Sequence, residues 1–367
     1  MSEPRRLKGH KATATCCIAS RDRPGIVATA GEDGCICWFD MRCKDAQLVM
    51  EVGQQPISSL CFKSGNEDII YVSSGSEVKC FDVHMATSSK LLQSYNYNKE
   101  EINQIACNSK AAFLASTDDY GEVKIIDIHQ HCLYKTLRGG HTSICSSVQF
   151  IPWRPWEVIT GGLDSKLVMW DFSRGRPLKI VDFGLPDMKS SNTAQCFNPA
   201  FVHAIAVPDA DMLDNSGHIC IAGRGDGVLN VIDIESELAA IRSKSTSKAR
   251  KGSQSISKEY IATAGTDGSR LHLDYSLGGH VAAVSCVAFS LFRERGKFII
   301  SGGNDKSVKV WDCFRYLGTG QSGCNNDILR LNIDLSKKVN WLCTTPTESE
   351  NLVVCDTTKV VKVYSVS

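Results

Sequence analysis

The chain has 367 residues, of which 41 are basic and 40 are acidic, so its formal net charge is +1. This length fits two or three ordinary domains or one large repeat fold. A hydrophobic fraction of 43% excludes wholesale disorder. No stretch approaches the roughly 18 uninterrupted apolar residues of a membrane helix. The first residues contain no apolar signal core, so we expect no export from the cell.

Cysteine is unusually frequent, with seventeen copies. The cysteines are scattered singly through apolar, strand-like runs, and no C-x-x-C pair typical of zinc sites occurs. This pattern favours a reduced compartment in which cysteine packs as a small hydrophobic residue. We therefore predict an intracellular protein, in the nucleus, the cytoplasm or both, with no metal site and no cofactor.

Strand-like runs recur along the chain, and each ends in an aromatic or aliphatic residue followed by Asp. In chain order these pairs are Phe39-Asp40, Phe81-Asp82, Ile126-Asp127, Trp170-Asp171, Ile232-Asp233 and Trp311-Asp312, with Tyr364-Ser365 as a degenerate last copy. The first four aspartates are 42, 45 and 44 residues apart. A period of about 40–45 residues with Gly-His and Trp-Asp pairs is typical of WD40 propeller blades, so the chain resembles the WD40 family.

The resemblance implies an all-β fold, a seven-bladed WD40 propeller that forms one domain over residues 1–367. We expect the N-terminal RRLKGH and the C-terminal VVKVYSVS to complete one blade together, which closes the ring. Residues 236–258 are predicted to be a flexible basic loop after the third strand of blade five. Residues 260–275 are predicted to extend blade five, and an incomplete eighth blade is the alternative.

In the WD40 family a buried His, Ser or Thr, Asp and Trp form a hydrogen-bonded chain within a blade. Blade one keeps only three of these residues, because Phe39 stands in place of the Trp. A catalytic role is the alternative, but repetition at blade spacing favours a structural one. The matching residues are His10, Thr29 and Asp33, then His141, Thr160, Asp164 and Trp170, and finally His280, Ser301, Asp305 and Trp311.

No catalytic motif such as G-x-S-x-G, a phosphate loop or H-E-x-x-H occurs in the chain. Function in such folds depends on surface loops rather than on the fold itself. We therefore predict a non-enzymatic protein-interaction scaffold.

Residues 26–42 resemble the extended WD box, ending in Asp-x-Arg, of propellers that dock on damage-specific DNA-binding protein 1 in cullin-4 ubiquitin ligases. The final Asp and Arg of that box are Asp40 and Arg42, whereas His84 and His129 stand at the position of Arg42 in blades two and three. The resemblance implies that Asp40 and Arg42 contact the ligase adaptor. The alternative is that Arg42 is an ordinary solvated charge.

Further stretches, at residues 100–127, 141–171, 198–200, 301–312 and 338–342, resemble WD40 proteins regarded as substrate receptors of the cullin-4 ligase. The implied function is a substrate receptor that recruits an unidentified target protein. A ligase-independent scaffold or a reader of a basic protein tail is the alternative.

Loops after third strands and loops between first and second strands open on the same face of a propeller. Trp153, Arg154 and Trp156 lie in a loop of the second kind in blade four, so we expect them on the face of Arg42. Because Trp and Arg are enriched at interface hot spots, we predict that they contact the ligase adaptor. The alternative is that both indoles pack under the blade.

Residues 242–258 contain six basic residues and no acidic one, which is typical of a solvated flexible loop. Clustered positive charge can also bind nucleic acid through its phosphates, although the aromatic residues that would stack on bases are absent. The basic residues are Arg242, Lys244, Lys248, Arg250, Lys251 and Lys258.

Overall fold

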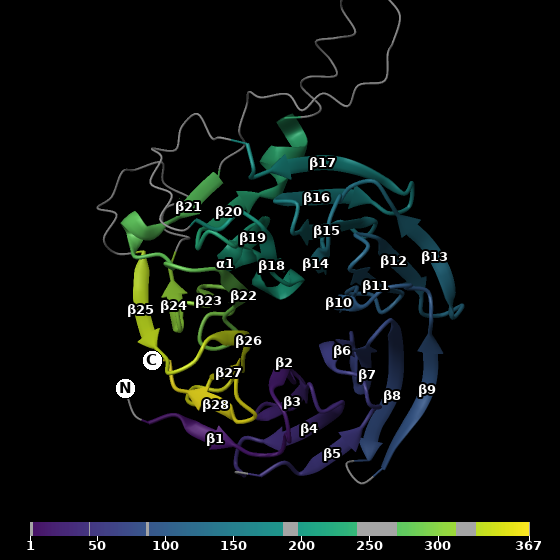
Figure 1. Ribbon diagram of the computed structural model, residues 1–367, viewed down its shortest axis with the longest axis vertical. Helices are drawn as coiled ribbons and strands as arrows, with labels where there is room; N and C mark the ends of the chain where they lie inside the picture. Colours follow the sequence, from purple (N-terminus) through teal and green to yellow (C-terminus); the bar gives the residue numbers. More distant parts are fainter. Residues whose placement is uncertain are drawn as a thin grey trace, which may run out of the picture.

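The computed structural model describes residues 3–43, 45–85, 88–185, 197–240, 270–312 and 328–366. Seven four-stranded antiparallel sheets stand around a central channel, so the predicted seven-bladed propeller is confirmed (Figure 1). Blades one to three contain β2(Ala14–Ala19), β3(Ile26–Gly31), β4(Cys35–Asp40) and β5(Leu48–Glu51), then β6(Ile57–Lys63), β7(Asn66–Ser74), β8(Glu77–Met85) and β9(Ser88–Tyr95), then β10(Ile102–Cys107), β11(Phe113–Asp118), β12(Val123–Asp127) and β13(Cys132–Leu137). Blades four to six contain β14(Cys145–Phe150), β15(Glu157–Gly162), β16(Lys166–Asp171) and β17(Arg176–Asp182), then β18(Val202–Ala206), β19(Ile219–Arg224), β20(Leu229–Asp233) and β21(Arg270–Leu273), then β22(Val284–Phe289), β23(Ile299–Gly303), β24(Ser307–Trp311) and β25(Leu329–Asp334).

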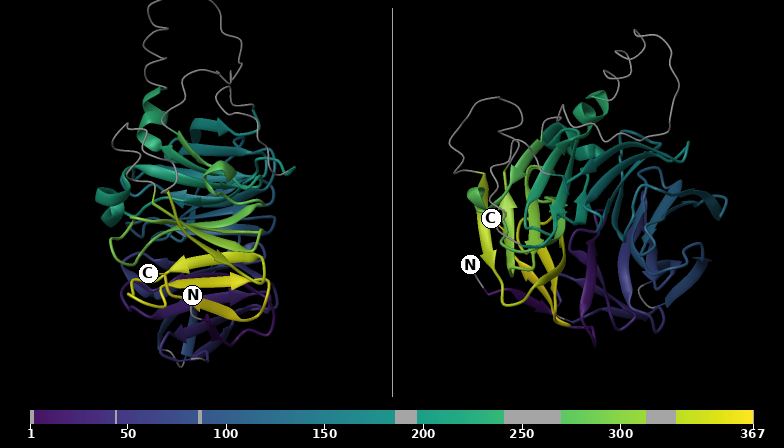
Figure 2. Two further views of the ribbon diagram at one scale, coloured as in Figure 1. Left: turned by 90° about the vertical axis from the view of Figure 1, so that its left-hand side faces the viewer. Right: turned by 45° about the horizontal axis from the view of Figure 1, so that its top comes forward.

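The seventh blade joins the two ends of the chain. It contains β26(Val339–Thr344), β27(Leu352–Asp356), β28(Val361–Tyr364) and the N-terminal β1(Arg5–Leu7), which pairs with β28. Leu7 is fully buried, and Arg5 lies 2.7 Å from the carboxylate of Glu350. Figure 2 shows both ends of the chain beside this blade. The predicted closure of the ring by the two termini is therefore confirmed.

In each blade the first strand lines the channel, and the fourth lies at the rim of the ring. The buried aliphatic residues of the second and third strands form the cores between neighbouring blades. The Asp of the repeated pair ends the third strand in blades one, three, four and five. Every cysteine among the described residues is a free thiol, and most of them lie in strands.

A ring of hydrogen bonds joins the innermost strands of neighbouring blades. In six blades the side chain of the second residue of the innermost strand donates to the carbonyl of the first residue of the next innermost strand. In blade five the second residue is His203, for which the structure shows no such bond among the described residues. Because the donors are short polar side chains, these bonds fix the spacing of the blades at one end of the channel. The bonds are Thr15 to Ile57 at 2.5 Å, Ser58 to Ile102, Asn103 to Cys145 at 3.3 Å, Ser146 to Val202 at 2.5 Å, Ser285 to Val339 at 2.6 Å and Asn340 to Ala14 at 3.2 Å.

Strand β21 pairs with β20 and is the outermost strand of blade five, so the described part of the predicted extension over residues 260–275 belongs to this blade. The flexible loop was predicted over residues 236–258, but its first residues, 236–240, belong to a helical segment at residues 234–240. Leu238 and Glu237 of this helical segment are buried, and the Glu237 carboxylate lies 2.5 Å from Arg270 and 3.1 Å from Lys179. Burial of an apolar side chain and of a paired charge holds these residues to the blade. Residues 241–269 lie outside the described residues.

The channel has a volume of about 610 Å³ and is lined by the first strands of all seven blades. At its mouth lie η1(Ala210–Met212) and α1(Leu213–Ser216), in the loop between the first and second strands of blade five (Figure 1). Arg21 of blade one pairs with Asp209, and Arg295 of blade six lies 2.6 Å from Asp211. These ion pairs connect the blade-five loop to blades one and six.

Candidate protein-interaction sites

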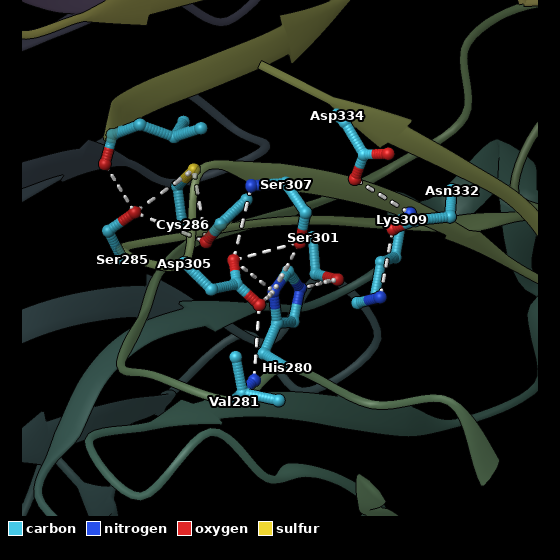
Figure 3. Close-up of polar contacts among 12 residues, drawn as sticks. His280, Val281, Ser285, Cys286, Ser301, Asp305, Ser307, Lys309, Asn332 and Asp334 are labelled. Carbon is cyan, nitrogen blue, oxygen red and sulfur yellow. Dashed lines mark hydrogen bonds and ion pairs between the residues drawn. The ribbon is translucent and has the colours of Figure 1, made fainter. Parts of the chain in front are cut away.

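The predicted hydrogen-bonded chain in blade six is complete, and Figure 3 shows its part from Ser301 through His280 to Asp305. The indole Nε1–H of Trp311 donates to Ser301 Oγ at 2.9 Å, and Ser301 Oγ lies 2.8 Å from His280 Nε2. His280 Nδ1 lies 3.0 Å from Asp305, which also accepts the backbone N–H of Val281 at 3.1 Å. A neutral imidazole with its proton on Nδ1 fits these contacts, because Nδ1 then donates to Asp305 and Nε2 accepts from Ser301. The chain therefore uses every polar atom internally, and this favours a structural role over a catalytic one.

The electrostatics of this chain favour the neutral imidazole and the charged carboxylate. Burial lowers the pKa of His280 despite the attraction of Asp305. Burial alone would raise the pKa of Asp305, but its bonds with His280, Ser307 and Val281 outweigh burial and lower it to about 2.

Blade four repeats the whole of this hydrogen-bonded chain, and blade one repeats part of it. In blade four, Thr160 Oγ1 lies 2.7 Å from His141 Nε2 and accepts the indole N–H of Trp170 at 2.8 Å, while Asp164 lies 3.0 Å from His141 Nδ1. In blade one, the bonds run from Asp33 through His10 to Thr29, at 3.1 and 2.7 Å. The chain ends there because the buried Phe39 has no donor, as the sequence predicts.

Arg42 lies in the turn that follows β4, and its side chain is 87% exposed. Its guanidinium is held by Asp40, whose carboxylate accepts bonds from Arg42 Nε at 2.9 and 3.1 Å and a further bond from Nη2. The bonds from Arg42 outweigh the effect of burial and lower the pKa of Asp40 below its ordinary value. Asp40 thus presents an oriented guanidinium to solvent, with donors of Arg42 still free to meet a partner.

Trp153 and Arg154 face inward, toward blade five. The indole N–H of Trp153 donates to Glu235 at 3.1 Å, and its ring packs edge-on against His218. Arg154 Nη1 lies 2.8 Å from Glu157, and Arg154 Nε lies 2.8 Å from Glu235. The hydrogen bond with Glu235 is the main cause that raises the pKa of Arg154. Both side chains therefore connect blade four to the helical turn after β20.

Trp156 is different, because 47% of its surface is exposed. Its ring lies 5.6 Å from that of Phe113 and 5.5 Å from that of Phe172. Of the two indoles in the predicted contact site, one thus packs inward and the other faces solvent. Trp153, Arg154 and Trp156 lie in blade four, which stands across the ring from blade one and Arg42 (Figure 1).

Comparisons with known proteins agree with this geometry. The family described as "WD domain, G-beta repeat" matches residues 1–40, 131–171 and 272–312. The first two matched segments end with the last residue of a third strand, Asp40 of β4 and Asp171 of β16. The third ends one residue after Trp311, the last residue of β24. This chain is a seven-bladed propeller that contains WD40 repeats.

The WD40 propeller is also similar to curated proteins over much of its length. It is 26% identical over 386 residues to the "WD repeat-containing protein 53 homolog" of Dictyostelium discoideum, covering 98% of this chain and 94% of the relative. It is 25% identical over 209 residues to the "WD repeat-containing protein ATCSA-1" of Arabidopsis thaliana, covering 56% of this chain and 40% of that relative.

Within the described ranges, no three His, Cys, Asp or Glu side chains gather in a way that could hold a metal ion. No helix in the part of the chain that the structure describes is long and apolar enough to cross a membrane. The six basic residues of the predicted contact loop, between residues 242 and 258, lie outside the described residues.

Sequence reasoning missed several partners of the predicted residues. Glu235, which holds Trp153 and Arg154, lies in a segment predicted to precede a loop. Tyr134 lies on the outermost strand of blade three, and its ring is 6.4 Å from that of Trp156. No local pattern pairs residues so far apart in the chain, although the repeat places the loops of neighbouring blades side by side.

Proposed function

We propose that this WD40 propeller is a non-enzymatic substrate receptor that docks on damage-specific DNA-binding protein 1 in a cullin-4 ubiquitin ligase through Arg42. The observation that carries the proposal is the guanidinium of Arg42, which is exposed yet oriented by the nearly buried Asp40. An oriented guanidinium loses less side-chain entropy on binding than a free one and presents directed hydrogen-bond donors to a partner.

The resemblance of residues 26–42 to the extended WD box supports the same function. The similarity to the WD repeat-containing protein 53 homolog extends over nearly the whole chain, so the docking blade and the remaining blades have counterparts in one relative. Within such a receptor, blade one would face the ligase adaptor, and other loops would recruit the target.

The test measures the affinity of the purified chain for immobilised damage-specific DNA-binding protein 1. We expect Arg42→Ala to weaken binding by about 2 kcal/mol or more, which is about 30-fold, because a hot-spot arginine and its hydrogen bonds are lost. The matched control is Arg138→Ala, which removes another exposed arginine that is paired with a carboxylate, Glu122. Equal binding by a folded Arg42→Ala variant would exclude this docking site.

A further inference from the structure

Blades three and four share an aromatic surface at the outer part of the ring. Trp156 and Tyr134 are 47% and 37% exposed, and their rings lie 6.4 Å apart. Beneath them, Phe113 lies 5.1 Å from Tyr134 and Phe172 lies 6.2 Å from it. We call Tyr134 and Trp156, with these two supporting rings, the aromatic shelf.

The fold itself does not require a tryptophan at position 156. The Trp156 carbonyl accepts the backbone N–H of Phe172 at 3.0 Å, and the same bond recurs in three other blades. There the accepting residues are Gly25, Ala112 and His218. Because glycine and alanine serve in the same backbone position, the exposed indole is an addition to the blade rather than a part of its construction.

Positively charged side chains project beside the shelf. Arg174 is 66% exposed, and Arg176 is exposed on the strand that follows. Lys135 lies 5.8 Å from the ring of Tyr134 and packs against Gly175 of the same turn. The shelf therefore has a cationic margin on the side of the turn between β16 and β17.

The neighbouring carboxylates already hold internal donors, and two of the three are recessed. Asp171 is 16% exposed and lies 3.4 Å from Arg174, and Glu157 is 16% exposed and pairs with Arg154. Glu235 is 43% exposed but is held by Arg154 and Trp153. A partner that approaches the shelf thus meets projecting guanidinium and ammonium groups.

We propose that the aromatic shelf and its cationic margin bind a segment of a partner protein with an apolar anchor residue flanked by Asp or Glu. A hollow of about 360 Å³ beside Trp156, lined also by Trp153, Arg154, Pro155, Glu157 and Glu235, receives the anchor. Both carboxylates are already paired with Arg154. The flanking carboxylates of the partner pair with Lys135, Arg174 and Arg176, and such pairs are charge-assisted hydrogen bonds. Trp, Tyr and Arg together make the composition typical of interface hot spots.

This surface is separate from the docking turn of Arg42, and Trp156 binds this partner instead of the ligase adaptor that the sequence predicted for it. Blade four and blade one stand on opposite sides of the ring (Figure 1). A variant that disrupts one surface is therefore expected to leave binding at the other unchanged. An experiment can thus contradict either proposal without affecting the other.

The test selects a display library of random twelve-residue peptides on the immobilised full chain. We expect enrichment of peptides with an aromatic or aliphatic residue flanked by acidic residues. The enriched peptides are then synthesised with a fluorescent label, and their affinity is measured by fluorescence anisotropy. We expect Trp156→Ala to weaken their binding at least tenfold. The double variant Arg174→Glu with Arg176→Glu is also expected to weaken peptide binding. Its loss of affinity is expected to be larger at low salt than at high salt, because salt screens the charges.

The matched control is Tyr120→Ala, which removes a tyrosine that is 73% exposed in the turn between β11 and β12, on the opposite face. This variant and Arg42→Ala are expected to bind the peptides like the unchanged chain. Thermal melts show whether Trp156→Ala folds, and Tyr134→Ala supplies a second variant if it does not. No enrichment, enrichment of basic peptides, or equal binding by both folded shelf variants would overturn the proposal.

Discussion

At the scale of single residues, the aspartates of the blade networks do more than neutralise a histidine. Asp305 accepts bonds from Val281, Ser307 and His280 at once, and Asp164 similarly holds His141 and the backbone N–H of Thr142. A carboxylate with so many donors is costly to protonate, and the loops it holds then lose their anchor. These residues therefore determine how the propeller responds to acid.

We predict that acid destabilises the protein in two stages. Unfolded histidine takes up a proton below a pKa of about 6.5, but burial lowers the pKa of His280 in the fold, so stability falls as the pH drops below that value. The pKa of Asp305 is about 2 in the fold, against an ordinary value of 3.8. Its contribution is complete above pH 3.8 and is lost as the pH falls toward 2.

The variant Asp305→Asn isolates the second stage. It removes a charged acceptor, so we expect the free energy of unfolding at pH 7 to fall by about 2 kcal/mol. It also removes a titrating group, so further loss between pH 4 and pH 2 becomes smaller than in the unchanged chain. Urea unfolding at several pH values measures both effects, with Asp214→Asn, at an exposed carboxylate, as the control. An unchanged acid dependence in Asp305→Asn contradicts this assignment.

At the scale of the blade, a glycine and an aromatic residue are matched to each other. A Cβ placed on Gly140 would overlap the ring of the fully buried Trp170, whose N–H is fixed by Thr160. In blade one a Cβ on Gly9 would lie 3.2 Å from the smaller ring of Phe39 and 2.9 Å from Cys37 Sγ. The blade with the complete network thus leaves less room above its aromatic residue.

We therefore predict that Gly140→Ala is more destabilising than Gly9→Ala. Overpacking of a close-packed core costs about 1–3 kcal/mol, and we expect Gly140→Ala at the upper end and Gly9→Ala at the lower end. Equilibrium unfolding in urea compares the two variants under the same conditions. If Gly9→Ala lowers the free energy of unfolding as much as Gly140→Ala does, the size of the Trp170 indole does not determine the effect of an added methyl group.

The repeated motif was enough to predict the blades, because WD40 strands end in recognisable pairs, and these pairs are regularly spaced through the first four blades. It was not enough to predict how degenerate blades hold together. In blade three, Asn98 takes the place of the histidine and bonds to Ser116 at 2.7 Å and to Asp118 at 2.9 Å. Asn and His differ in shape but offer similar donors and acceptors, so a search for Gly-His overlooks this network.

The bonds between blades were also missed, although their signal is present in the sequence. Thr15, Ser58 and Ser146 are each the second residue of an innermost strand and donate to the next blade. Each is an unremarkable polar residue by itself, and the pattern becomes visible only when the blades are aligned. The split between Trp153 and Trp156 could not be predicted, since it depends on Glu235 and Phe113 from other blades.

At the scale of the whole molecule, the propeller is a closed scaffold that separates two surfaces. Arg42 stands on blade one, and the aromatic shelf stands on blades three and four across the ring. Closure by β1 and the hydrogen bonds between blades hold these surfaces at a fixed separation. A rigid separation suits a protein that holds one partner while it presents another.

Amide hydrogen exchange with and without purified damage-specific DNA-binding protein 1 tests the central claim most directly. The amides of Met41, Arg42 and Cys43 all lie in the turn held by Asp40 and Gly25. We predict that binding slows exchange in this turn and leaves the turn around Tyr120, on the opposite face, unchanged. Protection at other blades with no change at residues 41–43, or no protection anywhere, would contradict docking through Arg42.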